Sequence, residues 1–223
     1  MLSFSQEKEV RDITSYPNSV IVLNWTYNSW IGDVAPRMII SPFSMGVDLY
    51  AMQTLLGKDN FISMAVGGGL SVQNIKSNSG LYSSDSSIFK VIPKELNYKT
   101  NKLSTVFVDL PIEFRFRIRP NPRDKAGIVR KRNLRCAIGF KIGYNIQNYI
   151  KYEGQDYREL NYSNNIKFKE YNLRNILPYR YGIYCRVGVG SFSLHAYYAL
   201  TKFFEKEKGP SIRPFSIGLS VTI

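Results

Sequence analysis

The stretch KLSTVFVDLPIEFRFRIR, residues 102–119, decides the fold class because its residues alternate in polarity with a period of two. One side of the stretch is apolar and holds Val106, Val108, Leu110, Ile112, Phe114, Phe116 and Ile118. The other side is charged and holds Asp109, Glu113, Arg115, Arg117 and Arg119. Successive side chains of a β-strand point to opposite faces of a sheet. The stretch therefore predicts one long strand with an apolar face and a charged face.

Seven further segments show the same period of two, within residues 19–28, 43–52, 61–74, 134–146, 180–189, 192–201 and 215–223. Their apolar faces are rich in branched and aromatic residues, and their other faces combine Gly, Ser and Ala with charges. Small residues and paired charges suit a crowded interior better than a surface, so we expect the apolar face to contact lipid. The predicted fold is all-β, an eight-stranded antiparallel transmembrane β-barrel.

The connections between these segments support the same fold. The two longest lie at 74–101 and 151–177, and tight ones lie at 54–60 and 190–191. If both chain ends lie in the periplasm, the barrel has short periplasmic turns and two long extracellular loops. We expect the barrel to span residues 19–223. Residues 1–18 are interpreted as an N-terminal segment, either a periplasmic lead-in with the remnant of a signal peptide or an ordinary cytosolic start.

Composition excludes several other classes of protein. The chain has 44% hydrophobic and 14% aromatic residues, which is too many for a disordered protein. It has two cysteines, which disfavours a disulfide scaffold, and one histidine, which disfavours a metal site. No stretch of about 18 uncharged apolar residues is present, so transmembrane helices are not expected. No cofactor is predicted.

The net charge of +13 has two main locations in this interpretation. The first is the barrel lumen, where the alternation places Asp48, Glu113, Arg115, Arg117, Lys141, Arg180 and Arg186. Inward charges are costly unless they are paired. An eight-stranded barrel is just wide enough for side chains to fill it. We therefore favour a network of salt bridges that fills the lumen, with a gated or selective small channel as the alternative.

The second location is a basic turn at the periplasmic interface, made of Arg123, Lys125, Arg130, Lys131 and Arg132. Such a turn could meet the phosphates of outer-membrane lipid, either phospholipid or lipopolysaccharide, or an acidic protein partner. A nucleic-acid partner is not predicted, because no RNA-binding motif, zinc spacing or recognition helix accompanies the charges.

Aromatic residues gather near the ends of the predicted strands: Trp25, Tyr27, Trp30, Tyr144, Tyr149, Tyr152, Tyr179, Tyr181, Phe203 and Phe204. We interpret them as the girdles that flank the apolar band of a membrane barrel. The run Gly67–Gly69 lacks the Lys-Ser/Thr of a phosphate loop, and we interpret it as a bend or a site of close interior packing.

His195 is the one residue that suggests catalysis. It is the only histidine of the chain, and Ser193 lies two residues away on the same face of a strand. A histidine with a nearby serine could hydrolyse or transfer acyl groups of lipids, but no third catalytic group can be identified. A packed structural histidine is the preferred interpretation, so an enzyme is not expected.

Four segments carry a resemblance to a known family: DLPIEFRFR (109–117), AIGFKIGYNI (137–146), PYRYGIYCRVGVGSFSLHAYYALTKFF (178–204) and KGPSIRPFSIGLSVTI (208–223). They resemble the PorT-type outer-membrane β-barrel family, which is typical of the Bacteroidetes. The resemblance implies an eight-stranded barrel in the outer membrane. It also implies a link to protein secretion of the type IX kind.

We therefore expect a non-enzymatic barrel that acts as an accessory or scaffold subunit of an outer-membrane secretion or assembly complex, with protein partners in that complex. Two alternatives inside the membrane are a lipid-modifying enzyme centred on His195 and a small channel. A soluble lipocalin-like carrier is a third alternative.

Overall fold

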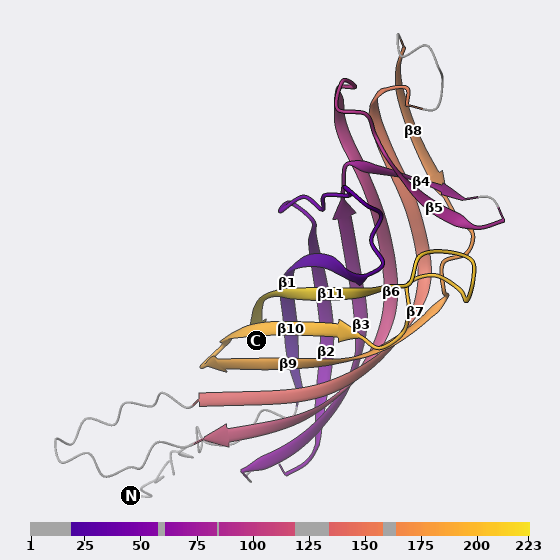
Figure 1. Ribbon diagram of the computed structural model, residues 1–223. Coiled ribbons are helices and arrows are strands. Elements are labelled where there is room, and N and C mark those ends of the chain that lie inside the picture. Colours follow the sequence, from indigo (N-terminus) through magenta and orange to yellow (C-terminus); the bar gives the residue numbers. More distant parts are fainter. Residues whose placement is uncertain (1–18, 58–60, 84, 119–133, 158–163) are drawn as a thin grey trace, which may run out of the picture.

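The computed structural model describes residues 19–57, 61–83, 85–118, 134–157 and 164–223. Eight antiparallel strands in this part of the chain form the barrel shown in Figure 1. They are β1 (Ser19–Gly32), β2 (Met45–Leu56), β3 (Ile62–Lys76), β6 (Tyr98–Ile118), β7 (Leu134–Gln155), β9 (Tyr179–Val189), β10 (Phe192–Ala199) and β11 (Ile212–Thr222). No helix among these residues is long and apolar enough to cross a membrane.

Pairing of each strand with its neighbours closes the sheet. The order runs β6-β3-β2-β1-β11-β10-β9-β7, and β6 pairs with β7 to complete the circle. Closure leaves no strand edge in lipid, which is what a membrane-spanning sheet requires. The predicted eight-stranded antiparallel barrel is confirmed. The two longest predicted connections lie at the same end of the barrel. We call it the extracellular end, and the opposite end periplasmic, on the expectation that both chain ends lie in the periplasm.

Three additional strands lie in those long connections, where the sequence pattern predicted loops. β4 (Ser79–Ser83) and β5 (Ser87–Val91) form a hairpin, and β8 (Asn165–Tyr171) pairs with the upper part of β7. The lower part of β7 pairs with β9 instead. β6 and β7 are the longest strands, and with β8 they extend the sheet beyond the barrel at the top of Figure 1. A register shift between Val106 and Phe107 marks the start of this extension.

The outer wall of the barrel is apolar, as the alternation predicted. Trp25, Leu110 and Leu219 are each about 60% exposed, an arrangement that is stable only against lipid. Other outward-facing apolar side chains are Ile21, Val47, Leu49, Leu70, Val108, Phe114, Ile138, Ile142, Ile183, Leu194 and Ile217. Along β1, β2 and β9, exposed apolar residues alternate with buried residues. The sequence pattern therefore reflects lipid outside the barrel and packed polar side chains inside it.

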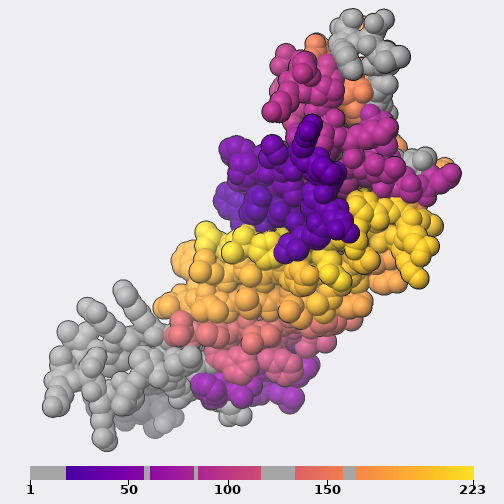
Figure 2. All heavy atoms as spheres, viewed as in Figure 1, coloured from indigo at the N-terminus to yellow at the C-terminus, as the bar shows by residue number. Residues whose placement is uncertain are grey.

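The extracellular end of the barrel is closed by an apolar cap. It consists of the buried residues Trp30, Ile75, Leu81, Phe89, Leu103, Ile150, Leu173, Ile176, Phe203, Phe204 and Ile212. The Trp30 ring lies 5.2 Å from that of Phe89 and 5.5 Å from that of Phe203, measured between centroids. In Figure 2 the segments after β1 and before β11 adjoin the β4–β5–β6 region at this end.

The apolar cap corrects part of the predicted aromatic girdle. Trp25, Tyr144, Tyr179 and Tyr181 are exposed on the outer wall, as a girdle requires. Trp30, Tyr152, Phe203 and Phe204 are instead buried, and they pack against side chains of the extracellular connections. The reason is the direction of the side chains: Trp30 and Tyr152 lie on the inward-facing sides of β1 and β7. Phe203 and Phe204 lie in the connection between β10 and β11, so none of the four faces lipid.

Candidate functional site: the charged interior of the barrel

Six of the seven residues proposed for the lumen network are buried inside the barrel. They are Asp48, Glu113, Arg115, Lys141, Arg180 and Arg186, each at most 7% exposed. Arg117 lies on β6 opposite Arg135 of β7, and its side chain lies outside the described structure. The basic turn of Arg123, Lys125, Arg130, Lys131 and Arg132 lies outside the described residues, as do Arg119 and the N-terminal segment 1–18.

Small residues on β7 let acidic and basic side chains meet across it. Gly143 is paired with Asp109 of β6 on one side and with Arg180 of β9 on the other. A Cβ atom at Gly143 would overlap the Asp109 carboxylate. Ala137 separates Arg115 from Arg186 in the same way. The small inward-facing residues of β7 therefore leave space for the charged side chains of β6 and β9. This packing explains why small and charged residues occur together on the inward faces.

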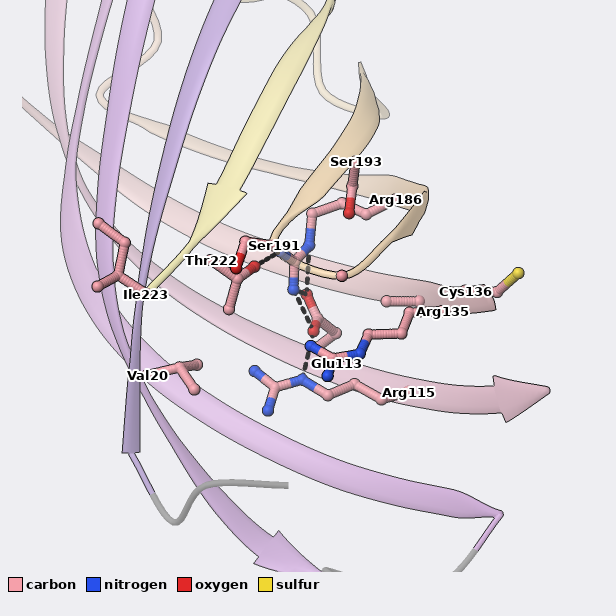
Figure 3. A pocket seen from close by; sticks show the side chains of 12 residues that line it. Val20, Glu113, Arg115, Arg135, Cys136, Arg186, Ser191, Ser193, Thr222 and Ile223 are labelled. Atoms are coloured by element: carbon pink, nitrogen blue, oxygen red, sulfur yellow. Dashed lines mark hydrogen bonds and ion pairs between the residues drawn. The ribbon is translucent and has the colours of Figure 1, made fainter. Parts of the chain in front are cut away.

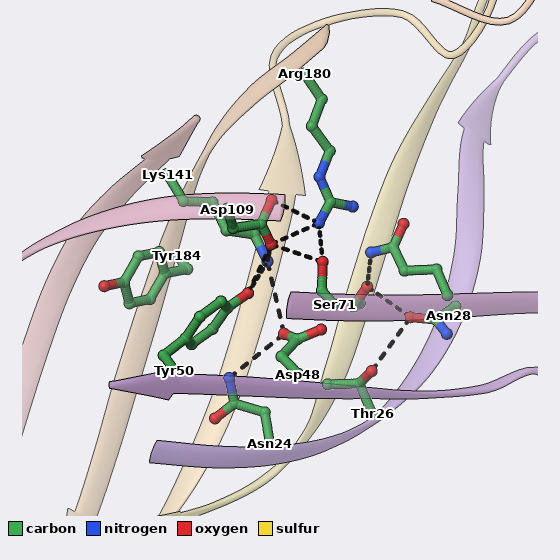
Figure 4. A network of polar contacts seen from close by, with 12 residues as sticks. Asn24, Thr26, Asn28, Asp48, Tyr50, Ser71, Asp109, Lys141, Arg180 and Tyr184 are labelled. Atoms are coloured by element: carbon green, nitrogen blue, oxygen red, sulfur yellow. Dashed lines mark hydrogen bonds and ion pairs between the residues drawn. The ribbon is translucent and has the colours of Figure 1, made fainter. Parts of the chain in front are cut away.

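The upper network is centred on Asp109, which has no exposed surface (Figure 4). Its carboxylate accepts hydrogen bonds from Arg180 Nη2 at 2.8 Å and from the Ser71 hydroxyl at 2.6 Å. The Tyr50 hydroxyl donates a third, at 2.8 Å. Arg180 also contacts Ser71, so four side chains from four strands lock together. Such multiple hydrogen bonds are what a buried carboxylate needs to remain ionised.

Lys141 joins a second carboxylate to this network. Its ammonium nitrogen lies 3.5 Å from an oxygen of Asp48 and 3.5 Å from an oxygen of Asp109, and it donates to the Tyr50 hydroxyl at 2.9 Å. It also lies 4.2 Å from the centre of the Tyr197 ring. Two carboxylates and two cations therefore balance in the upper network, and the balance explains why four charges can be buried together.

The lower network is centred on Glu113 and lies toward the end of the barrel that holds the C-terminus. Arg186 donates from Nη2 to both carboxylate oxygens, at 2.6 and 2.8 Å, and Arg115 Nε donates at 2.6 Å. The Tyr184 hydroxyl adds a contact of 3.2 Å. A second nitrogen of Arg186 reaches the Thr222 hydroxyl at 3.0 Å, which ties the network to β11.

The cavities between these layers are small. One lies between the two networks and is lined by Tyr50, Glu113, Lys141 and His195 among others, and a second lies below the apolar cap beside Trp30 and Phe203. Each has a volume of about 10 Å³, which is close to the space of a single water molecule. The described lumen is thus filled by side chains, and together with the apolar cap this leaves no room for a continuous pore through it.

A larger hollow of about 260 Å³ opens at the periplasmic end, below the lower network (Figure 3). Its lining includes Arg115, Arg135, Arg186 and Glu113, with hydroxyl groups from Ser191, Ser193 and Thr222. Cys136 belongs to the same rim, but its side chain points away from the hollow in Figure 3. Three guanidinium groups beside one carboxylate among the described lining residues suit contact with an anionic group.

His195 is buried inside the barrel, and Ser193 lines a different cavity. It is 2% exposed, and neither ring nitrogen has a hydrogen-bond partner within the described structure. Its ring packs 5.8 Å from that of Tyr184, between centroids. Ser193 instead lines the periplasmic hollow, a different cavity from the one that His195 borders. No group of three or more His, Cys, Asp or Glu suited to a metal occurs in the described segments.

Comparison with known proteins agrees with this architecture. Residues 58–205 match the family described as "Outer membrane protein beta-barrel domain". The chain belongs to this family of outer-membrane β-barrel proteins. Its location is therefore the outer membrane, as the alternation predicted.

One solved structure found as similar is that of Ail, the attachment invasion locus protein of Yersinia pestis, in complex with the heparin analogue sucrose octasulfate. It is 9% identical, covers 92% of this chain and 97% of its own, and superposes with a TM-score of 0.34. No curated protein matches the sequence significantly.

Proposed function

We propose that this barrel is a non-enzymatic scaffold or accessory subunit of an outer-membrane complex for protein secretion or assembly, of the type IX kind implied by the PorT-like sequence. The observation that carries the proposal is the filled lumen: the networks around Asp109 and Glu113 and the apolar cap occupy the interior of the described barrel. A barrel with such an interior acts through its surfaces. Its partners are other proteins of the complex and the lipid around it.

The extended sheet gives this scaffold a surface outside the membrane. β6, β7 and β8 continue past the rim of the barrel, and the β4–β5 hairpin lies beside them (Figure 1). The buried residues Ile92, Leu96 and Tyr152 pack beneath this sheet and make it a stable platform. A platform of paired strands is better suited to hold a protein partner than mobile loops would be, because less conformational entropy is lost on binding.

The test is gentle detergent extraction of the tagged, full-length protein from its native membrane, with chemical cross-linking before lysis and identification of cross-linked proteins. The proposal predicts stable co-purification with outer-membrane secretion or assembly proteins and a loss of secreted cargo in a deletion strain. A protein that purifies alone, from a strain whose deletion leaves secretion unchanged, would contradict it.

Lipid analysis of the same deletion strain tests the enzymatic alternative. We expect the acyl chains and phosphate content of its outer-membrane lipids to equal those of the parent strain. A change that is restored by the native protein and not by His195→Ala would instead establish a lipid-modifying enzyme.

A further inference from the structure

Four lysines lie side by side across four neighbouring strands at the extracellular rim. Lys76 of β3 is paired with Lys102 of β6, Lys102 with Lys151 of β7, and Lys151 with Lys169 of β8. Directly paired residues on antiparallel strands share a face of the sheet. Strands are about 4.8 Å apart, so this lysine row extends over about 14 Å.

The lysine row is on the outer face of the sheet. The residues next to it in sequence, Ile75, Leu103 and Ile150, are buried in the apolar cap on the opposite face. Lys169 is exposed, and the other three members are partly exposed. The row is therefore open to whatever surrounds the barrel at this height.

The row follows directly on the apolar wall. Val72 and Val106 form an outward-facing apolar pair, and Asn74 and Ser104 form the next pair on the same face. The lysines follow these pairs on the same face, about 13 Å from the valines along the strand. Measured along the membrane normal the separation is smaller, because the strands of a barrel tilt. Lipid headgroups begin where the hydrocarbon layer ends, so a barrel whose two long connections face outward would hold these ammonium groups at the height of the headgroups of the outer leaflet.

Aromatic rings hold the lysines in place on the membrane side. Tyr149 and Tyr171 are paired, with ring centroids 5.5 Å apart. The ammonium nitrogen of Lys169 lies 4.0 Å from the centre of the first ring and 4.5 Å from the second. A hydrogen bond with Tyr171 raises the pKa of Lys169, so this lysine is charged at neutral pH. Tyrosine at this height is typical of the interface between lipid and water.

The nearby carboxylate does not balance the row. Glu153, on the same face, forms ion pairs with Lys99 at 3.6 Å and Lys167 at 3.5 Å. These two lysines lie outside the row and add to its charge. Within the described part of this face, five lysines of β6, β7 and β8 therefore stand against one glutamate. Like charges directly opposite each other destabilise a sheet, so an external anion would stabilise this arrangement.

We infer that the lysine row binds the phosphate groups of lipopolysaccharide in the outer leaflet. A headgroup with more than one phosphate can engage a row about 14 Å long, whereas the single phosphate of a phospholipid reaches one or two lysines. A hollow of about 520 Å³ adjoins the row at Lys76. It is lined partly by Ile39, Phe43 and Tyr98, which offer apolar contacts beside the charges.

The experiment is titration of the full-length protein, folded in neutral detergent micelles, with diphosphorylated lipid A, with bound lipid counted by native mass spectrometry. The row variant is Lys102→Gln/Lys151→Gln/Lys169→Gln. The control variant, Lys94→Gln/Lys202→Gln/Lys206→Gln, removes the same charge from exposed extracellular lysines outside the row. Each of the three substitutions in the row variant removes about one contact between a lysine and a phosphate. We therefore expect the row variant to bind lipid A about a hundredfold more weakly, and the control variant to bind it like the native protein.

Three further arms decide between the ligand sources. A variant with arginine in place of the same three lysines keeps the positive charge and should retain binding. It also keeps the inference testable if the glutamine variant does not fold. Dephosphorylated lipid A and phosphatidylglycerol should bind weakly to the native protein. Inositol hexakisphosphate, a soluble polyanion, should compete only at high concentration.

Several results would overturn the inference: equal loss in the row and control variants, no loss in either, or equal binding of phosphatidylglycerol. Tight binding of the soluble polyanion without lipid would assign the row to a soluble ligand instead.

Discussion

The strands β6 and β7 carry charges on both of their faces, and the two faces treat them in opposite ways. In the lumen, Lys141 of β7 lies against Asp109 of β6 and Asp48 of β2, and Arg180 also pairs with Asp109. Two cations and two carboxylates cancel there. On the outer face of the extension, Lys102 and Lys151 are paired with each other, so the charges add. Both arrangements come from the same alternation in the sequence. The inward charges therefore stabilise the barrel by pairing within it, whereas the outward charges are open to an anionic ligand from outside.

The largest effect is expected from removal of a lumen carboxylate. Asp109→Asn removes the negative charge that pairs with two buried cations, Lys141 and Arg180. Breaking a buried ion pair costs about 3–5 kcal/mol of folding free energy. Urea unfolding of the protein refolded into lipid vesicles, followed by tryptophan fluorescence, measures the change. Lys151→Gln on the outer face is the matched control and should cost nothing. A loss below about 1 kcal/mol for Asp109→Asn would mean that the lumen network does not maintain the fold.

The second prediction compares the polar lumen with the apolar cap. Phe204 is 2% exposed, and its ring lies 4.9 Å from that of Phe203 and 5.9 Å from that of Phe89. Phe204→Ala should lower the free energy of unfolding by about 3 kcal/mol, because it leaves a cavity in a packed cluster. The same urea series measures it. An unchanged midpoint would show that the cap is not a cooperative part of the barrel.

The third prediction concerns the space that β7 provides. Gly143→Ala places a methyl group against the Asp109 carboxylate and should cost about 1–3 kcal/mol. Gly68→Ala is the control, since an added Cβ there would meet only Leu110 at 3.9 Å. Equal effects of the two substitutions in the urea series would refute the packing account of the small inward residues.

The smallest effect is expected on the outer face. Without lipopolysaccharide, Lys151→Gln should raise the free energy of unfolding by about 0.2–1 kcal/mol, because it removes two like-charge pairs. The gain should shrink or reverse when lipopolysaccharide is included in the vesicles. A loss of stability in vesicles without lipopolysaccharide would indicate that Lys151 already has a stabilising partner within the protein.

The sequence predicted what depends on local alternation. The number of barrel strands, the lipid-facing wall and the inward side of positions such as Asp109 and Arg180 follow from a period of two. For the run Gly67–Gly69 the sequence left a bend and close interior packing open, and the structure favours close packing, since a Cβ at Gly67 or Gly69 would overlap residues of β2.

What the sequence did not predict depends on register between distant strands. The lysine row joins residues 76, 102, 151 and 169, and a shift of one residue on any strand would abolish it. The apolar cap likewise joins Trp30 of β1 to Phe89 of β5 and to Phe203 of the connection before β11. The strand β8 was missed because its alternation is short: Ile166 and Phe168 mark one face, and Glu170 interrupts it at the next position.

Conductance across a planar lipid bilayer tests the central claim most directly, because a lumen filled by paired charged side chains and closed by an apolar cap should not pass ions. We expect the purified full-length protein to insert without steady conductance at neutral pH. The Phe203→Ala/Phe204→Ala variant serves as a comparison with a thinned cap. Large, steady and ion-selective conductance by the native protein would contradict the account and establish the barrel as a channel.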